Sequence, residues 1–335
     1  MEEKGEPSAK ASKTEDGGRS EVIPTTKIES KRERKKREHK ERRKEKRKEK
    51  RKERVERVES EGVVTSEQLL ETDYEITSIG PMTLRKVKPY FFEFKVFAKE
   101  RWIGSRIVDV FSSEFGMPVT FYEEQARNGK LLVGKDSSIE VFAVAKERLF
   151  EHGDLVRNQV HRHEPPVDGR QIRVLAETDE LVVVDKPPSI PVHPCGAFRH
   201  NSLVFILAKD IGMTNLHSIH RIDRLTSGVM MLAKSTDVAS KYMSQIQKGL
   251  TRKTYLARVS GKFPTDGSSE ESVVDQPIEL LQQTCGSGAK NRVGPDGKSA
   301  KTIFKGILYD SKSDTSVVLC RPLTGRTHQI RVHLE

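Results

Sequence analysis

Hydrophobic and polar positions divide the chain into three segments. Residues 1–75 hold few apolar side chains and many charges, a pattern typical of segments that bury no core. Residues 91–163 contain short amphipathic stretches, and residues 168–335 contain apolar strands interspersed with single helices. We therefore expect a disordered basic N-terminal tail, a small α+β domain and a larger α+β domain, in this order.

Two short helices and a closing strand are predicted in the small domain. Apolar residues over 107–111 recur at helical spacing. A second helix is predicted to end near Asn128-Gly129, because glycine readily adopts the left-handed conformation that closes a helix. A turn over 152–154 then leads into a strand over 155–160. This order resembles the S4-like RNA-binding fold, and a generic α+β module is the alternative.

The larger domain follows a Pro-rich linker, which we place at 162–169. Its predicted elements are four strands, over 181–184, 228–235, 252–263 and 315–325, and two helices, over 203–212 and 237–250. The stretch 264–297 is rich in Gly, Ser and Gln and is expected to be a long loop or a hairpin insertion. Strands interspersed with single helices predict the α+β class, with a mixed, mostly antiparallel sheet.

The net charge of the chain, +11, comes from one tract in the tail. Residues 31–54 hold seventeen Lys or Arg and six Glu, so the remainder of the chain is close to neutral. The glutamates recur every three to five residues, which permits i,i+4 ion pairs along a solvated helix without an apolar face. We interpret the tract either as a nuclear-localisation or RNA-tethering arm or as a solubilising tail.

Composition also restricts the cellular setting. The three cysteines, Cys195, Cys285 and Cys320, form no disulfide framework and no CxxC pair, which favours a reducing compartment and argues against a zinc site. The first residues lack the apolar core of a secretory signal, and their acids disfavour a mitochondrial presequence. No run of about 18 apolar residues occurs, so we expect no membrane span. Nucleus or cytoplasm is the expected location.

One short stretch concentrates candidate chemistry. In HRIDRLTSG, residues 220–228, the acid Asp223 lies between Arg221 and Arg224 and precedes an apolar strand. A carboxylate beside arginine is commonly a structural ion pair. The alternative is a catalytic carboxylate, because a polar turn at the edge of a buried strand is a rigid place for an active site. An arginine partner would also keep a nucleophilic carboxylate ionised. The residues alone leave both interpretations open.

Together with three further motifs, this stretch resembles the RluA-type pseudouridine synthases. The segments HRHEPPV (161–167) and SIPVHPCG (189–196) look most like the eukaryotic branch of that family. HRIDRLTSG resembles the family signature H-R-L-D-x-x-T-S-G, with Ile222 in place of Leu. LVVVDKPPSIPVHP (181–194), KTYLARV (253–259) and LTGRTHQIRVHL (323–334) are similar to three further motifs, in the family's order. The resemblance implies a catalytic domain of pseudouridine synthase type over 168–335, which an S4-like domain commonly precedes.

The resemblance also implies three catalytic residues. Asp223 would be the catalytic carboxylate, and would either attack C1′ of the target nucleotide or remove a proton from C2′ to give a glycal. Tyr255 would stack on the target base and take part in proton transfer, whereas without the resemblance it reads as an ordinary strand aromatic. Arg331 would pair with Asp223 and hold it ionised.

Four further residues are implied in substrate binding. Arg221 and Arg224 are expected to contact phosphates or to anchor their loop. Arg326 is expected either to support the site from behind or to face the RNA. His220 is expected to support the loop by a hydrogen bond.

The implied reaction is the isomerisation of uridines in RNA after the base leaves its stack. We expect the RNA to be tRNA, with rRNA or mRNA as alternatives. It is redox-neutral and activates no external water, so we expect no metal and no cofactor. Family members are often monomers, and we expect a monomer here. Two other classes stay open: a catalytically impaired RNA-binding remnant, and a glycosidase-like hydrolase, which needs a second carboxylate near Asp223.

The chain departs from the family at its end. It stops at RVHLE, residues 331–335, where the resemblance implies a further turn and more sheet strands. A chain ending there would leave apolar sheet edges exposed, at a large cost in stability. We therefore expect this truncated chain, by itself, to be poorly folded and weakly active or inactive.

Overall fold

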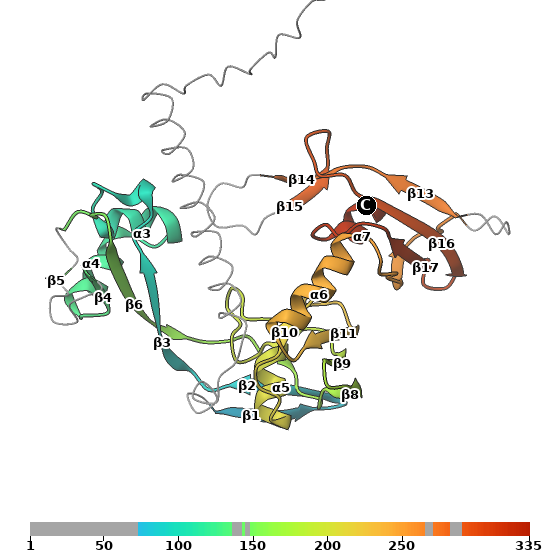
Figure 1. Ribbon diagram of the computed structural model, residues 1–335, viewed down its shortest axis with the longest axis horizontal. Coiled ribbons are helices and arrows are strands. Elements are labelled where there is room, and N and C mark those ends of the chain that lie inside the picture. The colour runs from blue at the N-terminus through green and yellow to red at the C-terminus, as the bar shows by residue number, and fades with distance from the viewer. Residues whose placement is uncertain (1–72, 136–142, 145–147, 265–270, 282–289) are drawn as a thin grey trace, which may run out of the picture. The chain divides into compact units, whose positions relative to one another are not determined.

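The computed structural model describes residues 73–135, 143–144, 148–264, 271–281 and 290–335 (Figure 1). The tail expected over 1–75, with its basic tract, lies outside the described residues except for its last positions. No helix in the described ranges is long and apolar enough to cross a membrane.

A small sheet begins where the tail was expected to end. Its order is β1-β2-β7, with β1 (Tyr74–Ile79), β2 (Met82–Val87) and β7 (Val167–Asp168). Tyr74 already pairs with Val87, so regular structure starts slightly earlier than expected. The predicted Pro-rich linker is also partly built into the fold, because β7 pairs with β2. Neither β1 nor β2 was predicted.

The segment that follows forms a sheet in the order β3-β6-β4-β5. Its elements are β3 (Tyr90–Phe97), η1 (Glu100–Trp102), α3 (Ile107–Phe115), α4 (Val119–Arg127), β4 (Leu131–Lys135), β5 (Ala143–Val144) and β6 (Asp154–Arg162). Both predicted helices and the predicted strand are confirmed, and α4 ends next to Gly129, whose φ is 69°. We did not predict β3, although its residues 92–96, FEFKV, alternate between apolar and polar side chains as a half-buried strand does. Likeness to the S4 fold stays a prediction.

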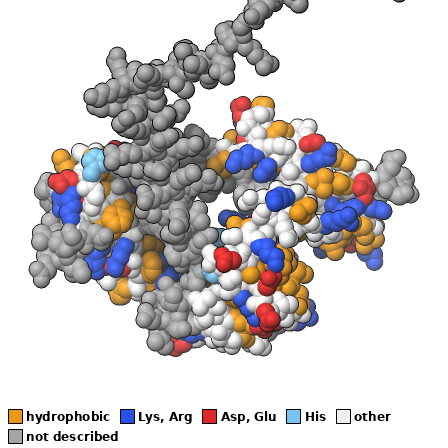
Figure 2. Space-filling view, viewed as in Figure 1, with side chains coloured by type: hydrophobic (Ala, Val, Ile, Leu, Met, Phe, Trp, Pro, Cys, Tyr) orange, Lys and Arg blue, Asp and Glu red, His pale blue; other side chains and the backbone are white. Residues whose placement is uncertain are grey.

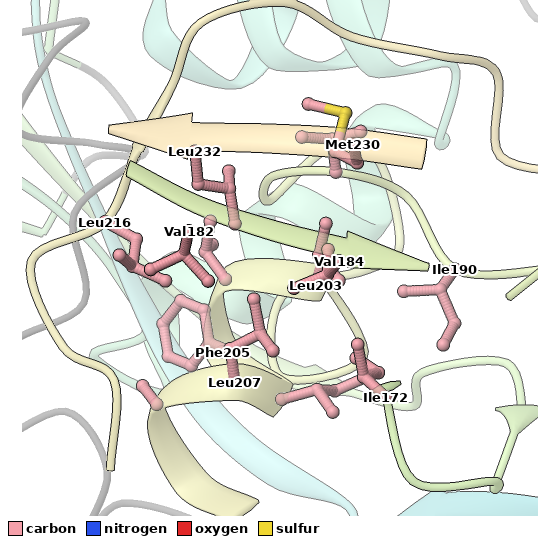
Figure 3. Packing of buried hydrophobic residues seen from close by; sticks show 14 of the residues in the cluster. Ile172, Val182, Val184, Ile190, Leu203, Phe205, Leu207, Leu216, Met230 and Leu232 are labelled. Carbon is pink, nitrogen blue, oxygen red and sulfur yellow. The ribbon is translucent and has the colours of Figure 1, made fainter. Parts of the chain in front are cut away.

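A third sheet has the order β10-β11-β9-β8. It packs in the largest cluster of buried hydrophobic residues in the described part of the chain. Its elements are β8 (Arg173–Glu177), β9 (Leu181–Lys186), α5 (Leu203–Ile211), β10 (His217–Ser218), β11 (Gly228–Ala233) and α6 (Thr236–Gln247). Side chains of α5 such as Leu203 and Phe205 point toward Val182 and Val184 of β9, in one apolar cluster (Figure 3). The predicted strands and helices of this segment are confirmed.

The last sheet has the order β12-β17-β16-β13. Its elements are β12 (Tyr255–Ser260), β13 (Ser272–Asp275), β16 (Lys301–Asp310) and β17 (Thr315–Pro322), with the hairpin β14 (Ile278–Leu281) and β15 (Lys290–Val293) and the helix α7 (Gln329–Leu334). The expected hairpin insertion is therefore present, while 282–289 lies outside the described residues. β13 and β16 were not predicted. Hydrophobic side chains remain at the surface in several places (Figure 2).

Every pair of neighbouring strands in the described residues is antiparallel. Helices and antiparallel sheets alternate along the chain, which confirms the predicted α+β class. The parallel pairing that a mixed sheet requires does not occur among the described strands of the larger domain. The order of elements also brings two loops together, one before β11 and one before α7, and these loops carry the candidate site.

Candidate active site

Asp223 lies in the loop between β10 and β11. The loop closes in a turn, in which the N–H of Thr226 donates to the carbonyl of Asp223 at 3.0 Å. Strand β11 then begins at Gly228, whose φ of 120° suits glycine. Met230 and Leu232 are fully buried in the core, so the strand holds the loop at a rigid edge. The side chain of Asp223 is 28% exposed, which leaves the carboxylate accessible.

Two basic side chains of the last motif, Arg331 and His328, face this carboxylate. Nη1 of Arg331 lies 3.8 Å from Oδ2 of Asp223, and Nε2 of His328 lies 3.9 Å from the same oxygen. The structure thus brings together Asp223 and Arg331, the pair that the resemblance implied. His328 precedes α7 in a left-handed conformation, with φ of 57°. A left-handed non-glycine residue is locally strained, and such residues cluster at functional sites.

A cavity of about 290 Å³ opens beside Asp223. It is lined by Pro191, Val192, His193, Cys195, Arg221, Ile222, Asp223, Arg224, Leu225, His328 and Arg331. Burial, followed by the charge of Arg221, lowers the pKa of His193, so this imidazole is neutral at pH 7. The wall therefore carries three arginines against one carboxylate. A small cavity of this charge suits one flat polar group attached to an anionic backbone.

A buried lysine ties the cavity wall together. Lys186 is fully buried, and its Nζ donates to the carbonyls of Pro187 at 2.8 Å, Ile190 at 2.7 Å and Arg224 at 3.2 Å. The segment after β9 is thereby joined to the loop of Asp223. Burial lowers the pKa of Lys186 to about 8, and the charge of Asp223 opposes this shift. We did not predict this residue, although it stands in the quoted motif DKPP.

Tyr255 lies at the start of β12, partly buried against Phe304, Val318 and Cys320. Burial is the first cause that raises the pKa of its hydroxyl, and the negative charge of Asp223 is the second. The phenol is therefore protonated at neutral pH and senses the carboxylate electrostatically. Tyr255 is absent from the described residues that line the cavity.

The other predicted residues divide between the cavity and its surroundings. Arg221 and Arg224 line the cavity, and the guanidinium of Arg224 also lies 5.3 Å from the ring centroid of Phe198. Nε2 of His220 accepts a hydrogen bond from the N–H of Met231 at 3.3 Å. Burial, then the charge of Lys253, lowers the pKa of His220, which keeps that acceptor neutral.

Arg326 lies outside the cavity lining. Its Nε donates to the carbonyl of Ser299 at 2.9 Å, and its backbone N–H donates to Oε1 of the buried Gln329 at 3.0 Å. Gln329 also donates to the carbonyl of Lys301 and accepts from Thr324. This network holds the turn that precedes α7. His328 and Gln329 were not predicted, although both stand inside the quoted last motif.

No group of three or more His, Cys, Asp or Glu that could hold a metal ion occurs in the described ranges. Cys195 is exposed at the cavity wall, Cys320 is buried in β17, and both are free thiols.

Comparison with known proteins identifies the family of the region that carries this site. A family model described as RNA pseudouridylate synthase matches residues 180–335, a range that includes all four motifs. The human pseudouridylate synthase RPUSD2 is 47% identical over 253 residues, which cover 75% of this chain and 44% of the human protein. The mitochondrial tRNA pseudouridine(32) synthase of Saccharomyces cerevisiae is 42% identical over 268 residues, covering 79% of this chain and 55% of the yeast protein.

RNA pseudouridine synthase 7 of Arabidopsis thaliana is 36% identical over 298 residues, which cover 84% of this chain and 72% of the plant protein. The chain spans about half the length of the human and yeast relatives. The similarity to the plant relative extends over most of both sequences. The chain therefore belongs to the RNA pseudouridylate synthase family of RluA type.

Proposed function

We propose that this chain isomerises uridine to pseudouridine in RNA, and that its RNA is tRNA. The observation that carries the proposal is the accessible Asp223 carboxylate at a cavity wall, with Arg331 and His328 within 4 Å of one oxygen. Family membership supports the reaction. The choice of tRNA rests on the yeast relative, which is named for a tRNA uridine.

In this proposal Asp223 acts on the ribose of the target nucleotide, either at C1′ or at the C2′ proton. The positive charge of Arg331 attracts the carboxylate and orients it toward the cavity. At 3.8 Å the contact is electrostatic rather than a close hydrogen bond, so it leaves the oxygen free to react. Both groups are partly exposed, which places them within reach of a nucleotide that has left its stack.

The proposed reaction conserves atoms and electrons. The N1–C1′ bond breaks, the uracil turns, and a bond forms between C5 and C1′. The proton on C5 leaves, and N1 gains one. Because there is no net oxidation and no water is consumed, we propose that neither a metal nor a cofactor takes part. Tyr255, protonated because burial and Asp223 raise its pKa, is assigned to stacking on the base and to proton transfer.

We assign RNA contacts to the arginines around the cavity. Arg221 and Arg224 lie on its wall, and their guanidinium groups match phosphate oxygens in charge and geometry. Arg326 is exposed next to the turn before α7 and is assigned to the RNA or to support of that turn. His220 supports the loop through its bond from Met231. A base that leaves its stack needs such contacts, since unstacking costs about a few kcal/mol.

We further propose that the chain acts as a monomer in the nucleus or cytoplasm, with the 31–54 tract as a basic arm. The name of the yeast relative makes the mitochondrion the alternative location.

The test is pseudouridine formation in tRNA, measured by carbodiimide labelling and reverse-transcription stops. The variants are Asp223→Asn and, as a matched control, Asp179→Asn, which changes an exposed aspartate elsewhere. We expect the first variant to lose about 10³-fold or more in rate and the control to keep the wild-type rate. An active Asp223→Asn protein contradicts the catalytic role. If the wild-type protein binds tRNA but forms no pseudouridine, the chain is an RNA-binding protein rather than an enzyme.

A further inference from the structure

The sheet β3-β6-β4-β5 has one open face with a distinct composition. Phe91 of β3 pairs with His161 of β6, and Phe97 pairs with Leu155. Residues directly opposite in an antiparallel pair project from the same face, and side chains along a strand alternate between faces. The residues of β3 at 91, 93, 95 and 97 therefore share a face with their partners in β6.

The opposite face of this sheet holds the core. Val96 and Val156, which also pair, belong to the cluster that includes Trp102 and Phe111. Helices α3 and α4 contribute the buried side chains of that cluster. The face that carries Phe91 is therefore the one turned away from this core. Both rings of this face are exposed, Phe91 at 60% and Phe97 at 46%. On the opposite face the core covers the end at Val96, while Phe94 of that face is 43% exposed.

Aromatic rings gather at one end of the open face. The ring centroids of Phe91 and His161 lie 5.0 Å apart, and those of His161 and His163 lie 4.6 Å apart. Lys130 Nζ lies 5.8 Å from the centroid of Phe91. Exposed aromatic rings leave apolar area in water, and a cluster of them commonly marks a binding site rather than ordinary surface. They are well suited to flat rings that stack.

Positive charge extends along the same face. Lys95 and Arg157 pair in the register, and both form ion pairs with Glu93, at 3.4 Å and 2.6 Å. Together with Lys130 the face holds three basic side chains and one acid. From Phe91 to Phe97 the strand extends about 20 Å, six residues at about 3.3 Å each.

We propose that this open face, defined by Phe91, Lys95, Phe97, Lys130, Arg157 and His161, binds single-stranded RNA by base stacking. Unpaired bases expose their ring faces and stack on aromatic side chains, while basic side chains follow the phosphates. A duplex hides its base faces, so it cannot use the rings. The proposal rests on the proposed function only for the choice of RNA as partner. The face uses none of the residues assigned to catalysis.

The first experiment measures binding of a fluorescein-labelled 12-nucleotide oligouridine to the full chain by fluorescence anisotropy, beside a blunt RNA duplex. Phe91→Ala is expected to weaken oligouridine binding by about 5-fold to 10-fold, given the usual loss per stacked base. Phe91→Tyr keeps a ring and is expected to bind like wild type. Phe115→Ala removes an equally exposed ring, at 59%, from α3 and is expected to stay within 2-fold.

The charges are tested by the salt dependence of the same binding. The double variant Lys95→Gln/Lys130→Gln is expected to reduce the slope of log K against log salt by about 1.4, because each contact to single strands contributes about 0.7. The contact itself is mapped with 4-thiouridine oligonucleotides, which are expected to crosslink to peptides that contain Phe91 or His161.

Several outcomes overturn the proposal: unchanged binding by Phe91→Ala, equal losses in Phe91→Ala and Phe115→Ala, or equal losses for oligouridine and duplex. Circular dichroism of each variant identifies a misfolded protein, and normal binding by Phe91→Tyr then separates stacking from folding. Pseudouridine formation is measured separately from oligouridine binding, so the two proposals can fail separately. If wild type forms no pseudouridine but Phe91→Ala still weakens oligouridine binding, the function fails and the stacking face stands.

Discussion

At the scale of single residues, the site depends on charges held at different degrees of burial. Asp223 is accessible and faces the Arg331 guanidinium, whereas Lys186 is fully buried behind the same loop. A surface ion pair alone contributes little stability, about 0–1 kcal/mol, so the pair of Asp223 and Arg331 is better explained by function. Lys186 has the opposite character: its three carbonyl partners make it a structural cation.

Replacing Arg331 is expected to reduce activity much more than stability. Arg331→Ala removes the charge 3.8 Å from Asp223, and we expect a loss of about 10-fold to 100-fold in kcat/KM, with a smaller loss in Arg331→Lys. Arg173→Ala is the control, because Arg173 is similarly exposed and pairs with Asp185. Rates on tRNA and the free energy of unfolding are measured for each. Equal losses in both arginine variants contradict the assignment.

Lys186 predicts a specific pH dependence of stability. Its folded-state pKa is about 8, below the 10.5 of an unperturbed lysine, so the unfolded chain binds more protons between these values. Its contribution to stability therefore rises with pH from about 8 to 10.5 and is constant below that window. Urea unfolding of wild type and Lys186→Met across pH 7–10.5 measures it. The wild type is expected to gain stability relative to Lys186→Met as pH rises, and a constant difference contradicts the prediction.

At the scale of elements, short segments without regular structure position the helices and strands. Glu164, in the predicted linker, accepts hydrogen bonds at 2.9 Å from the N–H groups of Arg199, His200 and Asn201, just before α5. The hydroxyl of Tyr90 donates to the same carboxylate at 2.7 Å. The linker therefore acts as a clamp on the start of α5, whose side chains pack against β9 and β11 in the buried core (Figure 3).

Glu164→Gln tests this clamp. The amide NH₂ replaces one acceptor oxygen with a donor that faces backbone N–H groups, so at least one buried donor loses its partner. We expect the free energy of unfolding to fall by about 1–3 kcal/mol. Glu151→Gln, whose side chain is 66% exposed, is expected to change it by about 0.5 kcal/mol or less. Urea denaturation of both variants is the measurement, and equal stabilities contradict the clamp.

At the scale of the whole molecule, charge is concentrated in one tract while the rest of the chain is nearly neutral. The 31–54 tract carries the entire net charge of +11, so long-range attraction to RNA is expected to come from the tail and recognition from the site. The two roles separate experimentally because they respond differently to salt and to local substitution.

Deletion of residues 31–54 is expected to weaken tRNA binding steeply at low salt and to flatten its salt dependence. Each phosphate that the shortened chain no longer neutralises lowers the slope of log K against log salt by about 0.7–0.9. At saturating tRNA the turnover rate is expected to stay near wild type, because the cavity is unchanged. Binding and single-turnover rates at two salt concentrations measure both effects. A turnover rate that collapses at saturation contradicts a purely electrostatic tail.

The sequence by itself determined much of the local structure and the chemistry of the motifs. Strands such as β9 and β11, and helices such as α3 and α5, followed from period and composition, because each buries one face in a continuous core. Asp223, Arg331 and Tyr255 were proposed as site residues from the family resemblance of their motifs, and their catalytic roles stay predictions. Strands β13 and β16 were missed, because weakly alternating strands owe their state to their partners. Strand β3 was missed although its residues 92–96 alternate between apolar and polar side chains.

Only the tertiary structure decided which residues far apart in the sequence lie in contact. It brought His328 beside Asp223 and directed the Lys186 ammonium to three carbonyls. It also placed the Glu164 carboxylate against the backbone N–H groups that precede α5. It also decided which face of β3 lies open, because strand register, rather than composition, assigns Phe91 and His161 to one side. Burial, strand pairing and pKa depend on neighbours far away in sequence, and only the folded chain brings those neighbours into contact.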